Sequence, residues 1–213
     1  ITEASGENST AMGGSTTASG SYSTAMGIST SANGQFSTAI GRHTIASDYD
    51  SLVIGQFNLS GSTVTNSATA FNVLNTAFVI GNGVDSSNRS DAFKVLFNGN
   101  TTIGNNLIAG GNVTATGDVI AYSDARVKEN VTTIDNALNK VTKLRGVTYT
   151  RKDVKDKETK MGVIAQEVLK VIPEIVHKDN KGMYAVAYGN MNGLLIEAIK
   201  ELKAEIDELK SKL

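Results

Sequence analysis

The chain is 213 residues long and carries 20 Lys and Arg against 21 Asp and Glu, which gives a net charge of −1. This balance argues against binding to nucleic acid through bulk positive charge. The chain has no cysteine, which excludes disulfides and thiolate metal sites. Its apolar runs fall short of the roughly 18 residues that a membrane helix needs, and its start shows no signal peptide. We therefore expect no nucleic-acid partner and no membrane insertion.

Composition changes abruptly after Tyr122. Residues 1–122 hold 16 of the 21 glycines with 3 Lys or Arg and 7 Asp or Glu, a net charge of −4. Residues 123–213 hold 5 glycines, 17 Lys or Arg and 14 Asp or Glu, a net charge of +3. A shift of this size at one point marks a domain boundary.

The first part of the chain is a seven-residue repeat. Each unit holds a glycine, a small apolar residue two positions before it and a hydroxyl residue three positions after it. The glycines are Gly6, Gly13, Gly20, Gly27, Gly34, Gly41 and Gly55, with Asp48 in the one remaining slot. A coiled coil also repeats every seven residues, but a glycine in each heptad costs about 1 kcal/mol relative to alanine. A flexible Gly/Ser linker would keep no such spacing.

The residue between the alanine and the glycine doubles the period. It alternates between apolar and polar, as Met12, Ser19, Met26, Asn33 and Ile40 show, so the true repeat is 14 residues. This pattern predicts a β-solenoid with two short strands in each coil. We expect Met or Ile to face the core, glycines to supply positive φ at the corners, and alanines to allow close packing.

These units resemble the YadA-like head repeats of trimeric autotransporter adhesins. The resemblance covers residues 4–55 and rests on the units at residues 11–13, 25–27 and 39–41. It implies a left-handed parallel β-roll that assembles with sister chains. We assign residues 1–57 to this adhesin-like head.

Residues 58–122 are expected to form a neck and a stalk. The seven-residue pattern is lost over residues 56–80, and short apolar stretches between glycines follow over residues 93–122. Strands this short do not form a self-sufficient sheet. We therefore expect an intertwined stalk in which short strands of three chains wind together.

The charged part of the chain opens with the octapeptide Ser-Asp-Ala-Arg-Val-Lys-Glu-Asn at residues 123–130. A serine followed five residues later by a lysine suggests a Ser–Lys dyad, here Ser123 and Lys128, because a lysine that loses its proton on burial can accept the serine proton. Judged by spacing alone, these residues are better interpreted as a polar cap that leads into a turn than as a catalytic dyad.

This octapeptide resembles the start of the intramolecular chaperone domain of endosialidase-type phage tail spikes. The same module occurs in other phage fibres and in the myelin regulatory factor. The resemblance continues through residues 161–168, 173–176 and 195–202, so that it covers residues 123–213 in order. It implies a self-cleavage dyad of Ser123 and Lys128 acting on the Tyr122–Ser123 bond. Asp124 and Arg126 are expected to position this loop.

The rest of residues 123–213 predicts an α+β domain that ends in a coiled-coil helix. We expect a helix over residues 134–144, strands at residues 147–149, 161–164 and 184–186, and a charged loop over residues 151–160. The last helix, about residues 190–213, has a seam with steps of 4, 3, 4, 3 and 4. Its members are Leu195, Ile199, Leu202, Ile206, Leu209 and Leu213. Alternating Ile and Leu favour two strands in parallel coiled coils, whereas the resemblance implies three.

Together these features predict the C-terminal part of a homotrimeric surface fibre, on a phage tail or a bacterial cell. Its C-terminal domain would act as an intramolecular trimerisation chaperone, and at most as a single-turnover, self-cleaving serine endopeptidase. The alternative is a non-catalytic adhesion fibre with a permanent C-terminal cap. The expected partners are the chain itself and a receptor or glycan on a target cell.

Other candidate chemistry is sparse. His43 and His177 are isolated in the sequence, so we expect no metal site and no cofactor. A glycan hydrolase would need a carboxylate pair in a groove, and no pair stands out in residues 1–122. Tyr22 and Phe36 lie 14 residues apart and are expected to stack, either against sister chains or facing a glycan.

Overall fold

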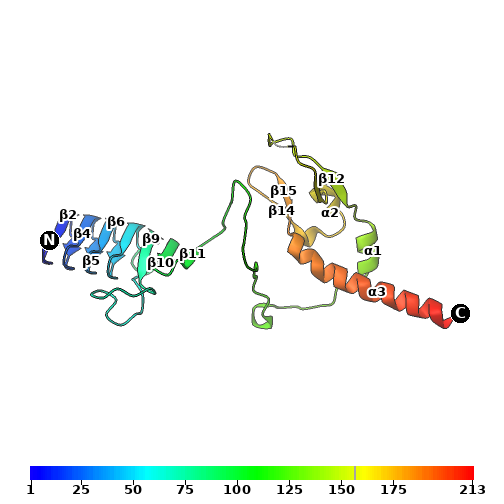
Figure 1. The fold of residues 1–213 in the computed structure, drawn as a ribbon, viewed down its shortest axis with the longest axis horizontal. Helices are drawn as coiled ribbons and strands as arrows, with labels where there is room; N and C mark the ends of the chain where they lie inside the picture. Colours follow the sequence, from blue (N-terminus) through cyan, green and yellow to red (C-terminus); the bar gives the residue numbers. More distant parts are fainter. Residues whose placement is uncertain (156) are drawn as a thin grey trace. The chain divides into compact units, whose positions relative to one another are not determined.

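A computed structural model describes residues 1–155 and 157–213. The chain divides into two compact units, Ile1–Asp118 and Val119–Leu213, which we treat separately (Figure 1). The predicted charged loop over residues 151–160 includes position 156, which lies outside the described residues. Within the described residues, no helix is both long and apolar enough to span a membrane.

The N-terminal unit is a β-solenoid of about four coils with the predicted 14-residue period. Each coil adds one short and one longer strand to two parallel sheets, which Figure 1 shows as a stack of similar coils. The short strands are β1 (Glu3–Ala4), β3 (Thr17–Ala18), β5 (Ser31–Ala32) and β7 (Ile45–Ala46). The longer strands are β2 (Thr10–Gly14), β4 (Thr24–Ile28), β6 (Thr38–Arg42) and β8 (Leu52–Gln56).

Small side chains fill the core of this solenoid. Ala18, Ala25, Ala32, Ala39 and Ala46 are all fully buried, and the hydroxyl residues that follow each glycine lie beside them. Because side chains alternate across a strand, the residues next to the buried alanines point outward. The prediction that Met or Ile faces the core is therefore wrong, since alanine, valine and hydroxyl side chains fill it.

The outward residues form a continuous apolar row along the longer strands. In-register pairing places Met12, Met26, Ile40, Ile54 and Ile80 side by side on successive strands. Met12 at the N-terminal end of this row is 54% exposed. We call these five residues the apolar row.

Positive φ occurs at both glycine and non-glycine positions. As predicted, Gly13, Gly27, Gly41 and Gly55 have positive φ, between 97° and 131°. Unlike the prediction, non-glycine residues occupy the left-handed conformation at the corners. They recur every seven residues, two positions after each glycine slot: Asn8, Ser15, Tyr22, Ser29, Phe36, His43, Asp50 and Phe57. Gly6 and Gly20 have no positive φ and meet a different demand, because a Cβ on either would lie 2.1 Å from a carbonyl oxygen of the next coil. The spacing between stacked coils therefore selects glycine.

Gly27→Ala should lower the free energy of unfolding of the N-terminal unit by about 3 kcal/mol or more. Gly27 has a φ of +128°, and a Cβ there would lie 1.9 Å from the Gly41 carbonyl oxygen. Gly14→Ala is the matched control, because its Cβ would meet nothing within 4 Å. We expect the control to change stability by less than about 0.5 kcal/mol. Equal denaturation midpoints for the two variants, measured by circular dichroism, would contradict this account.

The solenoid does not end where the repeat pattern is lost. Strand β9 (Thr76–Asn82) returns to the sheet parallel to β8, with Val53 opposite Val79, so the neck predicted at residues 56–80 is only partly outside the solenoid. Two antiparallel strands, β10 (Asp91–Leu96) and β11 (Thr101–Ile103), extend the same sheet. Residues 104–122 contain no helix or strand and are exposed.

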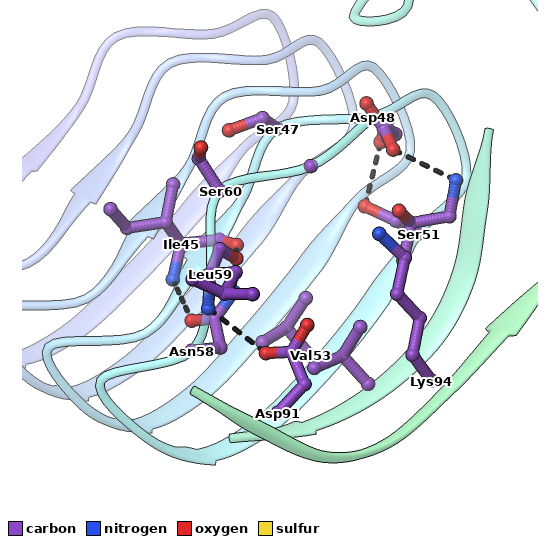
Figure 2. Close-up of a pocket in the computed structure, with 13 residues that line it drawn as sticks. Ile45, Ser47, Asp48, Ser51, Val53, Asn58, Leu59, Ser60, Asp91 and Lys94 are labelled. Carbon is purple, nitrogen blue, oxygen red and sulfur yellow. Dashed lines mark hydrogen bonds between the residues drawn. The ribbon is translucent and has the colours of Figure 1, made fainter. Parts of the chain in front are cut away.

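Polar side chains hold the inserted segment between β8 and β9 against the last coil (Figure 2). The Asn58 amide accepts from the Ile45 N–H at 2.8 Å and donates to the Ile45 carbonyl at 2.9 Å, so it occupies the free edge beside β7. The Asp48 carboxylate accepts from the N–H groups of Ser62 and Thr76, both at 2.8 Å. Asp48 replaces a repeated glycine because both ends of the insertion bind its side chain.

The C-terminal unit is α+β and ends in a long helix, as predicted. Its elements are η1 (Ala125–Val127), α1 (Ala137–Thr142), β12 (Val147–Tyr149), β13 (Lys160–Gly162), α2 (Ala165–Val168), η2 (Pro173–Ile175), β14 (Val176–Lys178), β15 (Tyr184–Val186), η3 (Tyr188–Asn190) and α3 (Met191–Ser211). Strands β12 and β13 form one antiparallel pair, and β14 and β15 form another. The strand predicted at residues 161–164 is not buried, since Met161 is 83% exposed.

Helices α1 and α3 pack together around the core of this unit. Leu194 and Ala198 of α3 are buried there with Ala137 of α1 and Val168 of α2. The Glu201 carboxylate accepts from the backbone N–H groups of Ala137 and Leu138, both at 2.8 Å. A residue of the last helix thereby satisfies donors at the N-terminus of α1 that have no partner within their own helix.

Candidate active site

A short 3-10 turn brings Ser123 and Lys128 together. Asp124 precedes η1 and accepts a hydrogen bond from the Arg126 N–H at 2.9 Å, as a residue at the start of a helical turn commonly does. The Val127 N–H then donates to the Asp124 carbonyl at 3.2 Å, and the Lys128 N–H donates to the Ala125 carbonyl at 3.1 Å. The turn therefore folds the backbone of Lys128 back toward Ser123.

The two side chains of the predicted dyad form a direct hydrogen bond. Lys128 Nζ donates to Ser123 Oγ at 2.7 Å. Both residues are exposed, and Tyr122, which precedes the bond predicted to be cleaved, is 98% exposed. This geometry permits proton transfer between the two groups, while the exposure leaves both of them in contact with water.

Asp124 and Arg126 contact each other. The Arg126 guanidinium donates through Nη2 to the Asp124 carboxylate at 2.6 Å, and through Nε at 3.0 Å. The hydrogen bonds from the Arg126 side chain and backbone lower the pKa of Asp124. An ion pair this exposed contributes little to stability. These contacts between Asp124 and Arg126 are consistent with the predicted role of both residues in positioning the turn. That role stays a prediction.

The predicted seam of the last helix has no partner among the described residues of the single chain. Leu195, Ile199, Leu202, Ile206, Leu209 and Leu213 are each between 40% and 107% exposed. The α1-facing side of α3 is instead buried through Leu194 and Ala198. Helix α3 thus presents one apolar face to its own domain and leaves a second one exposed.

Three contacts that position elements were not apparent from the sequence. The only sequence signal for Asp48 is that it occupies a glycine position of the repeat. Glu201 lies in the sequence as a charged residue beside the seam, which gives no indication of its contact with α1. Arg89 donates through Nη1 to the carbonyls of His43 and Asn58, both at 3.0 Å. Its partners lie 31 or more positions away in the chain, so no local pattern could reveal them.

The two histidines lie in different units. His43 stacks on Phe57 with ring centroids 4.6 Å apart, and His177 lies in β14. Across residues 1–155 and 157–213, no cluster of three or more His, Asp or Glu side chains is arranged to hold a metal ion.

Comparison with known families matches both parts of the chain. Residues 123–177 match the family described as Chaperone of endosialidase, and the match begins at Ser123. Two copies of the YadA head domain repeat match residues 4–30 and 32–58. The chain therefore carries a chaperone-of-endosialidase domain behind YadA head repeats. Both resemblances inferred from the sequence are confirmed over these matched residues.

The similar curated proteins are long tail fibre proteins of phages. The Gp37 proteins of Enterobacteria phages K3 and T2 are each 41% identical over 97 residues, which cover 42% of this chain but 8% and 7% of theirs. The Gp37 protein of phage M1 is 39% identical over 98 residues, covering 42% of this chain and 39% of the relative. The chain thus matches less than half of the length of these relatives. Their names agree with the predicted location on a phage tail fibre or cell surface.

A solved tail-fibre structure is also among the matches. It is the carboxy-terminal domain of the bacteriophage T5 L-shaped tail fibre with its intra-molecular chaperone domain. The match has a TM-score of 0.44 and 16% identity, and it covers 62% of this chain and 44% of the other.

Proposed function

We propose that this chain is the C-terminal part of a homotrimeric phage tail fibre. In this fibre, residues 123–213 act as an intramolecular trimerisation chaperone that is released by cleavage of the Tyr122–Ser123 bond. The observation that carries the proposal is the coincidence of three features at one position. The chaperone family match begins at Ser123, composition changes there, and Ser123 Oγ lies 2.7 Å from Lys128 Nζ.

Two unpartnered apolar surfaces support the trimer. One is the apolar row of the solenoid, and the other is the seam of α3. Exposed apolar surface of this extent marks an interaction site. Both surfaces run along an elongated element, as the interfaces of a fibre of parallel chains require.

The cleavage reaction uses groups on this chain alone. Lys128, with its amine neutral, accepts the proton of Ser123 Oγ while this oxygen attacks the Tyr122 carbonyl carbon. The C–N bond to Ser123 then breaks as Lys128 returns the proton to the leaving nitrogen. The resulting ester between Tyr122 and Ser123 Oγ is hydrolysed by water. The products are a carboxylate on Tyr122 and a free amino terminus on Ser123.

The fibre also needs a partner on its target cell. The relatives are long tail fibre proteins, and the head repeats resemble those of adhesins. We assign this chain a receptor or glycan of a target cell as its external ligand.

The intact chain should have a mass three times its own 22.4 kDa in light scattering. Ile206→Asp should lower this mass, because it places a carboxylate in the exposed seam of α3. Glu205→Asp, one position away and outside the seam, is the matched control and should keep the trimer mass. A monomer or dimer mass for the unaltered intact chain would contradict the proposed assembly.

A further inference from the structure

The aromatic side chains at one corner of the solenoid lie on its surface. The Tyr22 and Phe36 rings are stacked, with centroids 5.2 Å apart and an interplanar angle of 15°. The Tyr49 ring meets Phe36 edge-on at 5.4 Å. Tyr22 is 47% exposed and Phe36 is 40% exposed. We call these three residues the aromatic corner.

Two members of the aromatic corner occupy a backbone conformation that disfavours them. Tyr22 and Phe36 have φ of 60° and 61°, a region that bulky residues rarely adopt. Asn8 and Asp50, at the equivalent corners of the neighbouring coils, are residue types that accept this conformation readily. The aromatic rings therefore strain the backbone, although Tyr22 and Phe36 remain 47% and 40% exposed. Such a mismatch points to a functional role.

The corner at Phe57 differs, because its aromatic side chain has a structural role. Phe57 also has a positive φ, but it is only 6% exposed. It stacks on His43 and lies under the guanidinium of Arg42, at 4.9 Å from the ring centroid. Burial therefore accounts for Phe57, whereas Tyr22 stays 47% exposed despite its stack on Phe36.

Polar groups surround the aromatic corner. The inserted segment lies beside it, since the backbone N–H groups of Gln35 and Tyr49 donate to the carbonyls of Ala68 and Ser67 at 2.7 and 2.5 Å. Glu7 and Asp50 are exposed at the same corner of the first and last coils. Exposed rings with a few hydrogen-bonding groups around them suit a ligand that has both an apolar face and hydroxyls. The core of a subunit interface, by contrast, is depleted of charge.

We propose that the aromatic corner binds a neutral glycan. The C–H face of a sugar ring would pack on the aromatic side chains, and its hydroxyls would bond to the surrounding carboxylates and amides. Acidic groups at the corner disfavour an anionic sugar. Arg42 and Arg89, two of the three cations of residues 1–122, are engaged at Phe57. The inference deepens the proposed function, because it places the external ligand of the fibre on the solenoid.

Binding of neutral oligosaccharides of glucose, galactose or N-acetylglucosamine to the intact chain tests this site. Calorimetric titration should detect at least one of them, and polysialic acid should bind more weakly. Tyr22→Asn and Phe36→Asn should each weaken binding by about tenfold or more. Both variants should fold, because Asn already occupies this corner at position 8. Ser29→Asn, at a left-handed corner that is not in the register of Tyr22 and Phe36, is the control and should bind normally.

Three outcomes would overturn the inference. The first is that no neutral oligosaccharide binds. The second is that the two Asn variants bind as well as the unaltered chain. The third is that either variant loses the trimer mass, which would make the aromatic corner a subunit interface. Failure of the proposed fibre itself would appear separately, as a wrong mass for the unaltered chain.

Discussion

Residues 1–122 produced without residues 123–213 should aggregate instead of forming a soluble trimer. The solenoid leaves the apolar row partly exposed, and residues 104–122 form no helix or strand within the single chain. Contacts between chains form slowly when nothing holds the chains together, and unpaired strand edges aggregate in the meantime. A domain that trimerises first raises the effective concentration of the attached stalks. We expect loss of most of the soluble trimer, measured by size-exclusion chromatography with light scattering.

The same residues released after assembly should behave differently. Cleavage of a preformed trimer at the Tyr122–Ser123 bond, or at a protease site inserted there, should leave residues 1–122 trimeric. Their thermal unfolding should then be slow and poorly reversible, because the template is gone. If residues 1–122 made alone give the same soluble trimer with the same melting behaviour, the C-terminal domain is a passive cap.

Ser123→Ala and Lys128→Ala should each abolish the fragment of residues 123–213 on a denaturing gel. One substitution removes the nucleophile and the other removes the base, so either should reduce the cleavage rate by about a thousandfold or more. Lys128→Arg should be equally inactive, because a guanidinium does not give up its proton. Lys143→Ala, which removes another exposed lysine of the same domain, is the matched control and should cleave normally.

Cleavage should also depend on assembly. The dyad is exposed in the single chain, and an amine in contact with water favours its charged form. Sister chains that bury the pair would favour the neutral amine that the reaction needs. Ile206→Asp should therefore reduce cleavage together with the trimer mass, although position 206 lies far along the chain from Ser123. An uncleaved trimer of the unaltered chain would favour the permanent cap, and a fragment from the Ser123→Ala variant would refute the dyad.

Much of the architecture follows from the sequence because it depends on local repetition. Stacked coils must present the same small residue at the same place, so the spacing of Gly13, Gly27 and Gly41 reports the period directly. The turn at residues 123–128 is equally local, because an Asp cap and one 3-10 turn suffice to bring serine and lysine together. The stacking of Tyr22 on Phe36 follows from the same period and is confirmed.

Only the tertiary structure determined which side chains of the solenoid strands point into the core. Alternation along a strand separates Ala25 from Met26, yet both are apolar, so the pattern cannot say which one faces inward. The structure decides, because Ala25 is fully buried in the core whereas Met26 is not. The close spacing of stacked coils, and not a demand for positive φ, explains why Gly20 is glycine.

Contacts between distant parts of the chain also required the structure. Strand β9 rejoins the sheet after an insertion, Asp48 binds both ends of that insertion, and Glu201 holds the start of α1. The repeat determined how each coil is built, because every coil faces identical neighbours. Hydrogen bonds between residues that no periodic pattern relates decided where the solenoid ends and what anchors its insertion.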